Sequence, residues 1–382
     1  MTLESLTLFN FRNLANGAVS FSAGLNIVQG ANGQGKTNLM EAIYLLGTTK
    51  PFRRSRPREL VADGEDACSL KGRVEKNGRG DDLFFSVAEG GVKRFGRGDE
   101  VQDLYDYIGA LDTLAFTGEH LSIVRGGPEE RRKFVDRGIV GIKPGYLKVL
   151  VDYRKAIRQK NRLLGDAGRG STGNERGFLI ELEAWNERLI DLGSRILMER
   201  AAHVNRLHAL VREIHSGLFS DARPPVSMAM RTAIGDERSI DGEDAGSVRE
   251  RLKQELDSAS RRERERSVSL VGPHRDEIEF VYGGKPLRTF GSSGQQRGFL
   301  LAAKLGRAEI HREVSGGYPV FLFDDFESEL DRGGRTGFLQ YCRDRFQLFI
   351  AVSAEELDMG APWDRQKRFR IQQGRVSDLG GC

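Results

Sequence analysis

One segment of this chain, 30–37, constrains the possible folds more than any other. Its sequence, Gly-Ala-Asn-Gly-Gln-Gly-Lys-Thr, matches the pattern G-x-x-x-x-G-K-[ST]. Glycines in such a loop let backbone N–H groups surround phosphates, and the N-terminus of the following helix favours their negative charge. An apolar run, 25–28, precedes the loop, and apolar residues at helical spacing follow it over 37–46. Strand, loop and helix in this order predict an α/β domain that binds a nucleotide.

The loop assigns roles to individual residues. Lys36 is expected to neutralise the β- and γ-phosphates as a catalytic residue, and Thr37 is expected to hold Mg²⁺. Arg53 lies in a basic stretch after the helix. It either has a binding role, in contact with the nucleotide or with DNA, or is simply a surface arginine. Contacts with ATP are expected along the whole segment, from Gly30, Ala31, Asn32, Gly33, Gln34, Gly35, Lys36, Thr37 and Asn38.

Two carboxylates follow an apolar strand near the C-terminal end of the chain. The strand is predicted at 320–323, and Asp324 and Asp325 follow it directly. Carboxylates at the end of a buried strand are unfavourable unless they face a cation or hydrogen-bond donors. Because Mg²⁺ prefers oxygen ligands, Asp324 is expected to hold the metal. Asp325 is expected to act as a general base or to position the attacking water.

A third segment, Phe290-Gly-Ser-Ser-Gly-Gln-Gln-Arg297, lies just before an apolar helix pattern. By itself, Ser292 would be an ordinary helix N-cap. The order of P-loop, long insertion, S-x-G-Q, acidic strand end and Ser328-Glu-Leu-Asp331 is, however, that of ATP-binding-cassette (ABC) ATPases. This order predicts an ATP-dependent homodimer in which the loop of one protomer completes the nucleotide site of the other. The loop residues are Ser292, Gly294 and Gln295, and Ser328 and Asp331 are expected to form the D-loop.

Long helical patterns lie between these motifs, at 146–164, 178–219 and 248–266. The densest basic helix segment either follows a DNA phosphate backbone or keeps an exposed helix in solution. Its basic residues are Arg154, Lys155, Arg158, Lys160 and Arg162. A polar, glycine-rich stretch at 233–247 is expected to be a loop, and strand patterns return at 267–271 and 276–282.

The expected fold class is α/β, an ABC-type P-loop ATPase head with an inserted helical lobe. The head is expected to contain a mixed sheet around the P-loop helix and an antiparallel sheet. Its expected limits are 1–135 and 262–382, and those of the lobe are 136–261.

Composition narrows the kinds of protein to which this chain can belong. No stretch approaches the roughly 20 apolar residues that cross a bilayer, and the N-terminal residues do not form a secretory signal. A cytoplasmic protein with no membrane partner is therefore expected. The net charge of +4 does not by itself indicate nucleic-acid binding. Three widely spaced cysteines with no CxxC pair argue against a zinc site or a disulfide framework.

Together these residues resemble the RecF family of bacterial recombination-mediator ATPases, in the SMC/ABC class. The matching blocks are 6–14, 24–44, 50–53 with 59–60, 116–136, 272–276, the loop at Ser292, and 324–331. The resemblance implies a slow, DNA-stimulated ATPase that dimerises with ATP and binds duplex and gapped DNA. It also implies action in recombinational repair and replication restart with RecO and RecR, which helps to load the recombinase at gaps.

Departures from the family pattern concern the sensing of the γ-phosphate and do not weaken the resemblance, and two alternative functions are weighed beside it. Gly118 stands where the family usually has proline, Gly291 and Ser353 also differ, and no glutamine is assigned to the Q-loop. A transporter ATPase subunit shares the three motifs, but such chains usually carry LSGGQ and an aspartate–glutamate pair where this chain has Asp324-Asp325. A nucleotide-gated DNA clamp with negligible hydrolysis is the second alternative. A long coiled-coil tether is nearly excluded by the short insertion.

Overall fold

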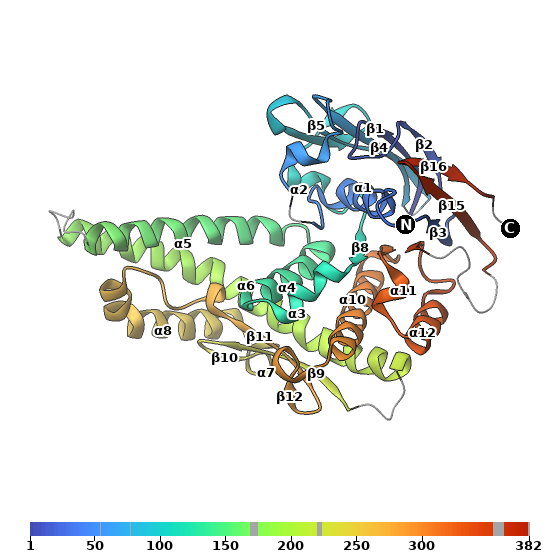
Figure 1. The fold of residues 1–382 in the computed structure, drawn as a ribbon. Helices are drawn as coiled ribbons and strands as arrows, with labels where there is room; N and C mark the ends of the chain where they lie inside the picture. The colour runs from blue at the N-terminus through green and yellow to red at the C-terminus, as the bar shows by residue number, and fades with distance from the viewer. Residues whose placement is uncertain (54, 77, 169–174, 220–223, 354–362, 381–382) are drawn as a thin grey trace. The chain divides into compact units, whose positions relative to one another are not determined.

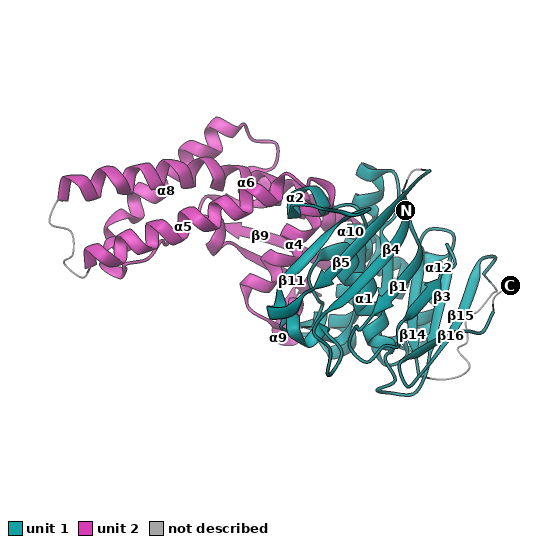
Figure 2. Ribbon diagram, turned by 90° about the horizontal axis from the view of Figure 1, so that it is seen from above, with its two compact units in different colours: residues 1–122, 211–224, 291–382 teal, residues 123–210, 225–290 magenta. Residues whose placement is uncertain are grey.

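The computed structural model describes residues 1–53, 55–76, 78–168, 175–219, 224–353 and 363–380 (Figure 1). The chain divides into two compact units (Figure 2). Unit 1 comprises Met1–Ser122, Val211–Pro224 and Gly291–Cys382, and unit 2 comprises Ile123–Leu210 and Pro225–Phe290. These limits differ from the expected head and lobe at each boundary. Within the described residues, no helix is both long and apolar enough to cross a membrane.

Unit 1 contains the sheet that carries the P-loop. Five of its strands are parallel, in the order β15 (Gln366–Gln372), β3 (Leu25–Gln29), β14 (Leu348–Val352), β13 (Val320–Phe323) and β8 (Thr113–Phe116). The edge strand β16 (Arg375–Asp378) pairs antiparallel with β15. Strands β13 and β14 are buried at every residue, which explains their continuous apolar sequences.

The second sheet of unit 1 is antiparallel. Its strand order is β2 (Gly17–Ser20), β1 (Thr2–Phe9), β4 (Cys68–Lys76), β5 (Arg79–Val87), β6 (Lys93–Arg97) and β7 (Glu100–Val101). Helix α1 (Lys36–Thr48) contacts strands of both sheets. Leu39, Met40, Ile43 and Leu46 of this helix are fully buried, because the helix lies between two apolar surfaces. The expected mixed and antiparallel sheets around the P-loop helix are confirmed.

Further helices and short helical turns complete unit 1. Aromatic rings pack around the end of β13, where Phe323 contacts Phe326 and Phe338 at centroid distances of 4.8 and 5.1 Å. This packing fixes the start of the acidic turn that follows β13. The remaining elements are η1 (Pro57–Leu60), η2 (Glu89–Gly91), α2 (Leu104–Tyr107), η3 (Gly118–Leu121), α10 (Ser293–Ser315), α11 (Phe326–Glu329) and α12 (Arg332–Cys342).

Unit 2 combines long helices with a small antiparallel sheet. The sheet has the order β10 (Gly235–Asp236), β9 (Val226–Thr232), β11 (Glu277–Tyr282) and β12 (Lys285–Pro286). Its helices are α4 (Pro128–Ile142), α5 (Tyr146–Gly168), α7 (Glu237–Ile240), α8 (Ala245–Arg266), η4 (Pro273–Arg275) and α9 (Leu287–Phe290). Helix α3 (Ser122–Arg125) begins at the boundary, and α6 (Glu175–Phe219) belongs to unit 2 up to Leu210.

Two local expectations about unit 2 are wrong. The stretch 267–271 is not a strand, because side chains satisfy its backbone: Ser269 N–H donates to Asn161 Oδ1 at 2.7 Å and Leu270 N–H to Glu263 Oε1 at 2.7 Å. The stretch 233–247 is not simply a loop, since it contains β10, α7 and the start of α8.

Buried ion pairs fix the helices of unit 2. The Arg200 guanidinium donates to both carboxylate oxygens of Asp136, at 2.8 and 2.9 Å, and to Asp276 Oδ2 at 2.8 Å. Lys160 Nζ lies 2.6 Å from Glu263 Oε2, and both side chains are almost completely buried. Removing one partner of such a pair would leave a buried, uncompensated charge, which makes these contacts strict positional constraints.

His274 of unit 2 gives a pH-dependent stability. Its Nε2 faces the Ser269 carbonyl oxygen at 3.2 Å and its Nδ1 faces the Tyr153 hydroxyl at 2.8 Å, so the neutral ring donates from Nε2 and accepts at Nδ1. Burial lowers the pKa of His274 to about 4, below the value of about 6.5 in an unfolded chain. The unfolded chain therefore binds a proton first as the pH falls. We therefore expect the free energy of unfolding to fall by about 2 kcal/mol through His274 when the pH is lowered from 8 to 5.

The measurement compares denaturant unfolding of the wild type and His274→Gln at both pH values. Burial raises the pKa of the nearby Asp276 carboxyl, which acts in the opposite direction in the wild type and in the variant alike. The difference between the two proteins therefore isolates His274. Equal losses of stability on acidification in both proteins would contradict this assignment.

Candidate nucleotide-binding site

The P-loop joins β3 to α1, and its glycines are required by conformation and by space. Gly33 and Gly35 have φ angles of 81° and 120°, a region that residues with a Cβ rarely adopt. A Cβ on Gly30 would lie 2.5 Å from the Ile371 carbonyl oxygen, and one on Gly35 would lie 2.8 Å from Leu14 Cδ2. The loop is therefore held tightly against neighbouring segments.

Hydrogen bonds from two other segments also position the loop. Gln373 N–H donates to Gln34 Oε1 at 2.6 Å, from the turn between β15 and β16. Asn13 Nδ2 donates to the Gly33 carbonyl oxygen at 3.3 Å, and Asn38 Nδ2 donates to Asn13 Oδ1 at 2.7 Å. Asn13 is a supporting residue that sequence reasoning misses as part of the site, although it lies in the first block that resembles the family.

Lys36, the first residue of α1, lies over the loop. Its Nζ is 2.6 Å from the Gly30 carbonyl oxygen and 3.1 Å from that of Ala31, and it also approaches Asn32 Oδ1 at 3.5 Å. Burial lowers the pKa of Lys36, and the carboxylates of Asp324, Asp325 and Glu327 partly offset this effect. The ammonium thus lies where phosphates held by the loop would meet it.

Thr37 and Asp324 are brought together from positions 287 residues apart. The Thr37 hydroxyl donates to Asp324 Oδ1 at 3.1 Å. Burial, and to a smaller extent Asp325, raises the pKa of Asp324, while Thr37, Arg53 and Lys36 oppose this rise. A buried carboxylate and a partly buried hydroxyl beside a phosphate loop fit Mg²⁺, which is held by one or two protein ligands together with phosphate oxygens and water.

Asp325 is placed differently from its neighbour Asp324. It adopts a left-handed conformation, with φ 53° and ψ 48°, and its side chain is exposed. Ser328 donates its hydroxyl to Asp325 Oδ2 at 2.5 Å. The turn therefore separates one buried carboxylate, which suits a metal, from one accessible carboxylate, which suits a water molecule.

Two further residues belong to this site: Ser353, which stands where the family pattern carries a polar switch residue, and Glu327, which sequence reasoning misses. Ser353 directly follows β14, the strand between β3 and β13, and its Oγ lies 3.4 Å from Lys36 Nζ and 3.0 Å from Asn32 Oδ1. Glu327 Oε2 accepts a hydrogen bond from Ser353 N–H at 2.9 Å. The available signal for Ser353 is its position at the end of a buried strand, where the parallel sheet gathers its polar residues.

The predicted loop at the start of α10 forms a capping box. Ser292 Oγ accepts from Gln295 N–H at 3.2 Å, and Gln295 Oε1 accepts from Ser292 N–H at 2.8 Å. In the described chain, these hydrogen bonds of Ser292 and Gln295 stay within the first turn of α10. A Cβ on Gly294 would meet nothing within 4 Å, so this chain itself gives no spatial reason for glycine there.

The other predicted residues of unit 1 lie around the same strand ends. Arg53 Nη1 approaches Asn38 Oδ1 at 3.4 Å, and Arg53 is among the charges that lower the pKa of Asp324. Asp331 is the N-cap of α12, since its Oδ1 accepts from Gly334 N–H at 2.7 Å. Ser328 is linked to Asp325 as described above.

The predicted DNA contacts lie on α5 of unit 2. Arg154, Lys155, Arg158 and Arg162 are exposed, and Arg162 forms a long ion pair of 3.8 Å with Asp166. The expectation for Lys160 is wrong, because its side chain is fully buried and paired with Glu263. A lysine in that position cannot reach a phosphate backbone.

Comparisons with known proteins agree with this geometry. Residues 2–93 match the family model described as the RecF/RecN/SMC N terminal domain. The "DNA replication and repair protein RecF" of Geobacter sulfurreducens is 33% identical over 99% of this chain and 100% of its own length. The protein of the same name from Geobacillus thermodenitrificans is 35% identical over 93% of each chain.

Solved structures give the same result. The structure of the recombination mediator protein RecF with ATP, in the RecFOR pathway, is 28% identical, covers 99% of this chain and 97% of that chain, and superposes with a TM-score of 0.86. An SMC head domain from Pyrococcus furiosus is 16% identical, covers 99% of this chain and 96% of that one, and has a TM-score of 0.56. The latter likeness concerns the fold alone.

Proposed function

The chain belongs to the RecF family of DNA replication and repair proteins, and from this premise we propose that it is an ATP-dependent DNA-binding protein of recombinational repair and replication restart. It forms a dimer when it binds ATP, hydrolyses ATP slowly with stimulation by DNA, and helps to load the recombinase at gaps in damaged DNA. Its partners are duplex and gapped DNA, a second copy of itself, RecR and RecO, and it works in the cytoplasm.

The observation that carries this proposal is the meeting of Lys36, Thr37 and Asp324 at the end of the parallel sheet. Backbone N–H groups of the P-loop and the N-terminus of α1 bind the phosphates of ATP, and Lys36 neutralises the β- and γ-phosphates. Thr37 and Asp324 would hold Mg²⁺, which when bound neutralises charge that develops on the phosphate oxygens. The 3.1 Å contact between the two side chains supports this assignment.

Asp325 is proposed to orient the attacking water and to accept its proton. Its carboxylate is exposed, and Ser328 fixes one of its oxygens through a hydrogen bond. A water positioned on the other oxygen would then attack the γ-phosphate held by the P-loop. A positioned base of this type contributes on the order of 100-fold to 10,000-fold in rate.

The loop of Ser292, Gly294 and Gln295 is proposed to contact the γ-phosphate bound by a second protomer. The open space around Gly294 supports this role, because alanine would favour a helix by about 1 kcal/mol and nothing in this chain excludes it. A phosphate approaching the first turn of α10 would use that space and the N-terminal end of the helix. ATP would in this way join two protomers and place two basic surfaces on one DNA molecule.

Sedimentation velocity with and without ATP and duplex DNA tests the proposal as a whole. A dimer that forms only with ATP and binds duplex DNA more tightly than the monomer is the expected result. Monomers under all conditions would overturn it. An ATPase assay with and without DNA then separates a slow ATPase from a clamp with negligible hydrolysis. The family membership favours the repair function over a transporter subunit.

The Asp325→Asn variant is expected to separate ATP binding from hydrolysis. Asparagine adopts the left-handed conformation of this position readily, so the turn should keep its shape. ATP binding should stay within about twofold, because Asp324 and Thr37 are intact, while hydrolysis should fall roughly 100-fold for lack of a base. Single-turnover hydrolysis and sedimentation check the result, since the variant should accumulate as the ATP-bound dimer.

The matched control is Asp344→Asn, which changes another exposed aspartate of unit 1 with a left-handed backbone, at φ 61°. Asparagine adopts this conformation readily, and Asp344 has no assigned role at the nucleotide site, so hydrolysis by this control should stay close to that of the wild type. If Asp325→Asn hydrolysed ATP at the wild-type rate, the general base would have to be another residue.

A further inference from the structure

A hollow of about 310 Å³ opens among α4, α5 and α6 of unit 2, outside the nucleotide site. Its walls include Leu150 and Ile157 of α5 and Ile196 of α6. Leu150 and Ile157 are seven residues apart, so they project from the same face of their helix. The walls therefore offer an apolar surface large enough for a side chain from outside the chain.

Two polar side chains that line the base of the hollow, Arg200 and Tyr153, already have hydrogen-bond partners. Arg200 is held by Asp136 and Asp276 at 2.8–2.9 Å, and the Tyr153 hydroxyl is bonded to His274 at 2.8 Å. Because these groups bond to one another, a ligand need not supply hydrogen bonds to Arg200 or Tyr153 at the base of the hollow. The shape of the hollow is also rigid, since buried ion pairs and helices form it.

The rim of the hollow, in contrast, carries more cationic side chains than carboxylates. Within the described ranges, Arg154 and Arg158 form neither an ion pair nor a hydrogen bond, and Arg132 donates to a neutral carbonyl oxygen, that of Asp276, at 2.6 Å. Five cationic side chains and two carboxylates line the hollow altogether. Both carboxylates already have cationic partners, Lys133 for Glu129 and Arg200 for Asp136.

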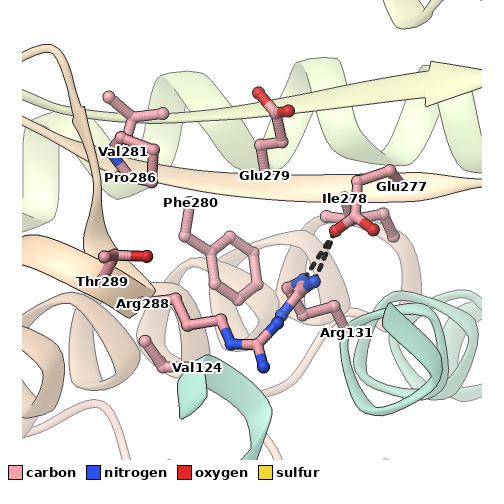
Figure 3. Close-up of a pocket in the computed structure, with 10 residues that line it drawn as sticks. All are labelled: Val124, Arg131, Glu277, Ile278, Glu279, Phe280, Val281, Pro286, Arg288 and Thr289. Carbon is pink, nitrogen blue, oxygen red and sulfur yellow. Dashed lines mark hydrogen bonds and ion pairs between the residues drawn. The ribbon is translucent and has the colours of Figure 1, made fainter. Parts of the chain in front are cut away.

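A second hollow of unit 2, of about 220 Å³, shows what a neutralised site looks like (Figure 3). There Arg131 donates to Glu277 through its guanidinium, with Nε at 3.1 Å. Arg288 and Glu279 also line this hollow, so its positive and negative charges are equal in number. The first hollow differs because three more cationic side chains than carboxylates line it.

We propose that the hollow among α4, α5 and α6 binds an acidic segment of a partner protein. One large apolar side chain of that segment would enter between Leu150, Ile157 and Ile196. Its carboxylates would pair with Arg132, Arg154 and Arg158, whose planar guanidinium groups match carboxylates in bidentate contacts. Apolar burial would supply affinity, and the rim charges would supply specificity and a fast approach.

Duplex DNA fits these observations less well. Its phosphates lie on a convex polar surface, so a backbone contact would leave the apolar walls of the hollow unfilled. Of the expected phosphate contacts on α5, moreover, Lys160 is buried and Arg162 is turned to Asp166. Among the described residues, Arg154 and Arg158 have no ion-pair or hydrogen-bond partner and line the hollow, whereas Lys155 is exposed and does not line it.

The test uses the full-length protein and a fluorescein-labelled peptide of aspartates around a single phenylalanine. Fluorescence anisotropy should show binding that weakens with salt, and replacing the phenylalanine by serine should weaken it about tenfold or more. The double variant Arg154→Glu/Arg158→Glu should lose at least about tenfold in peptide affinity. The matched control, Lys155→Glu/Arg162→Glu, makes the same charge change on the same helix but not at the hollow, and should bind as the wild type does.

Each other outcome overturns the proposal. These outcomes are the absence of peptide binding by the wild type, an equal loss of peptide affinity in the two double variants, or an unchanged affinity when serine replaces the phenylalanine of the peptide. Displacement of the peptide by unlabelled duplex, together with an equal loss of duplex affinity in Arg154→Glu/Arg158→Glu, would assign the hollow to DNA. Binding of ATP, measured in parallel, should be unchanged in both double variants, so a failure here is distinct from a failure of the proposed ATPase.

Discussion

Replacing Lys36 by alanine is expected to weaken ATP binding on the order of 1,000-fold and to abolish ATP-driven dimerisation. The Lys36 ammonium is the first charge that phosphates in the loop would meet, and a charge-assisted hydrogen bond contributes about 1.5–3 kcal/mol. Loss of two such bonds, to the β- and γ-phosphates, accounts for a change of this size. Titration with a fluorescent ATP analogue measures the affinity directly.

Two controls keep this result specific to the nucleotide site. Lys71→Ala removes an exposed lysine from β4 of the same unit, and its ATP affinity should equal that of the wild type. Ser353→Ala removes a hydroxyl 3.4 Å from Lys36 Nζ, and a loss of less than about tenfold is expected because the ammonium keeps its other partners. An unchanged affinity in Lys36→Ala would count heavily against the P-loop assignment.

The nucleotide site could be predicted from the sequence because its parts depend on local rules and on one general rule of sheets. The loop pattern fixes glycine conformations and the start of α1 without reference to distant residues. Residues at the carboxyl ends of parallel strands meet at one edge of the sheet, so Asp324 could be placed near Thr37 despite their separation. Ser353, directly after β14, obeys the same rule and stands at the polar switch position of the family pattern, whereas Glu327 lies in α11 and belongs to no motif recognised in the sequence.

The limits of the two units differ from those expected for the head and the lobe, and a long-range strand pairing accounts for part of the difference. Strand β11 pairs with β9 across all six of its residues, which keeps 277–282 in unit 2 rather than in the head. Strand β9 has the sequence Val-Ser-Met-Ala-Met-Arg-Thr, in which buried Val226, Met228 and Met230 alternate with less buried residues. The sequence of β9 does not indicate which strand it pairs with. The unit to which β11 belongs follows only from its hydrogen-bonded partner, β9.

The burial of Lys160, in contrast, was encoded in the periodicity of its helix. Tyr153, Ala156 and Leu164 are buried on one stripe of α5, and Lys160 lies on that stripe at helical spacing. Glu263 continues the buried stripe of α8 formed by Leu252, Leu256 and Ala259 in the same way. A count of basic residues along α5 suggests a DNA contact, whereas the face of each residue predicts a buried ion pair.

The Ser292→Arg variant is expected to bind ATP as a monomer and to lose dimerisation, hydrolysis and tight DNA binding together. The P-loop of each protomer is intact in this variant, so nucleotide affinity should stay within about twofold of the wild type. The arginine would occupy the space in which the hydroxyl is proposed to meet the γ-phosphate of the second protomer. A monomer also makes fewer phosphate contacts than a dimer, so its affinity for DNA and the salt dependence of that affinity should both fall.

The capping box makes a sharper experiment possible, because the structural and intermolecular roles of Ser292 can be separated. Ser292→Asp keeps a good N-cap for α10 but places a negative charge beside the γ-phosphate, whereas Ser292→Thr keeps both the hydroxyl and the cap. Sedimentation velocity with ATP should therefore show dimers for Ser292→Thr and monomers for Ser292→Asp, although both proteins have equal thermal stability. Dimers in Ser292→Asp and Ser292→Arg would mean that the loop only caps its helix, and the ATP-joined dimer of this chain would then need another contact.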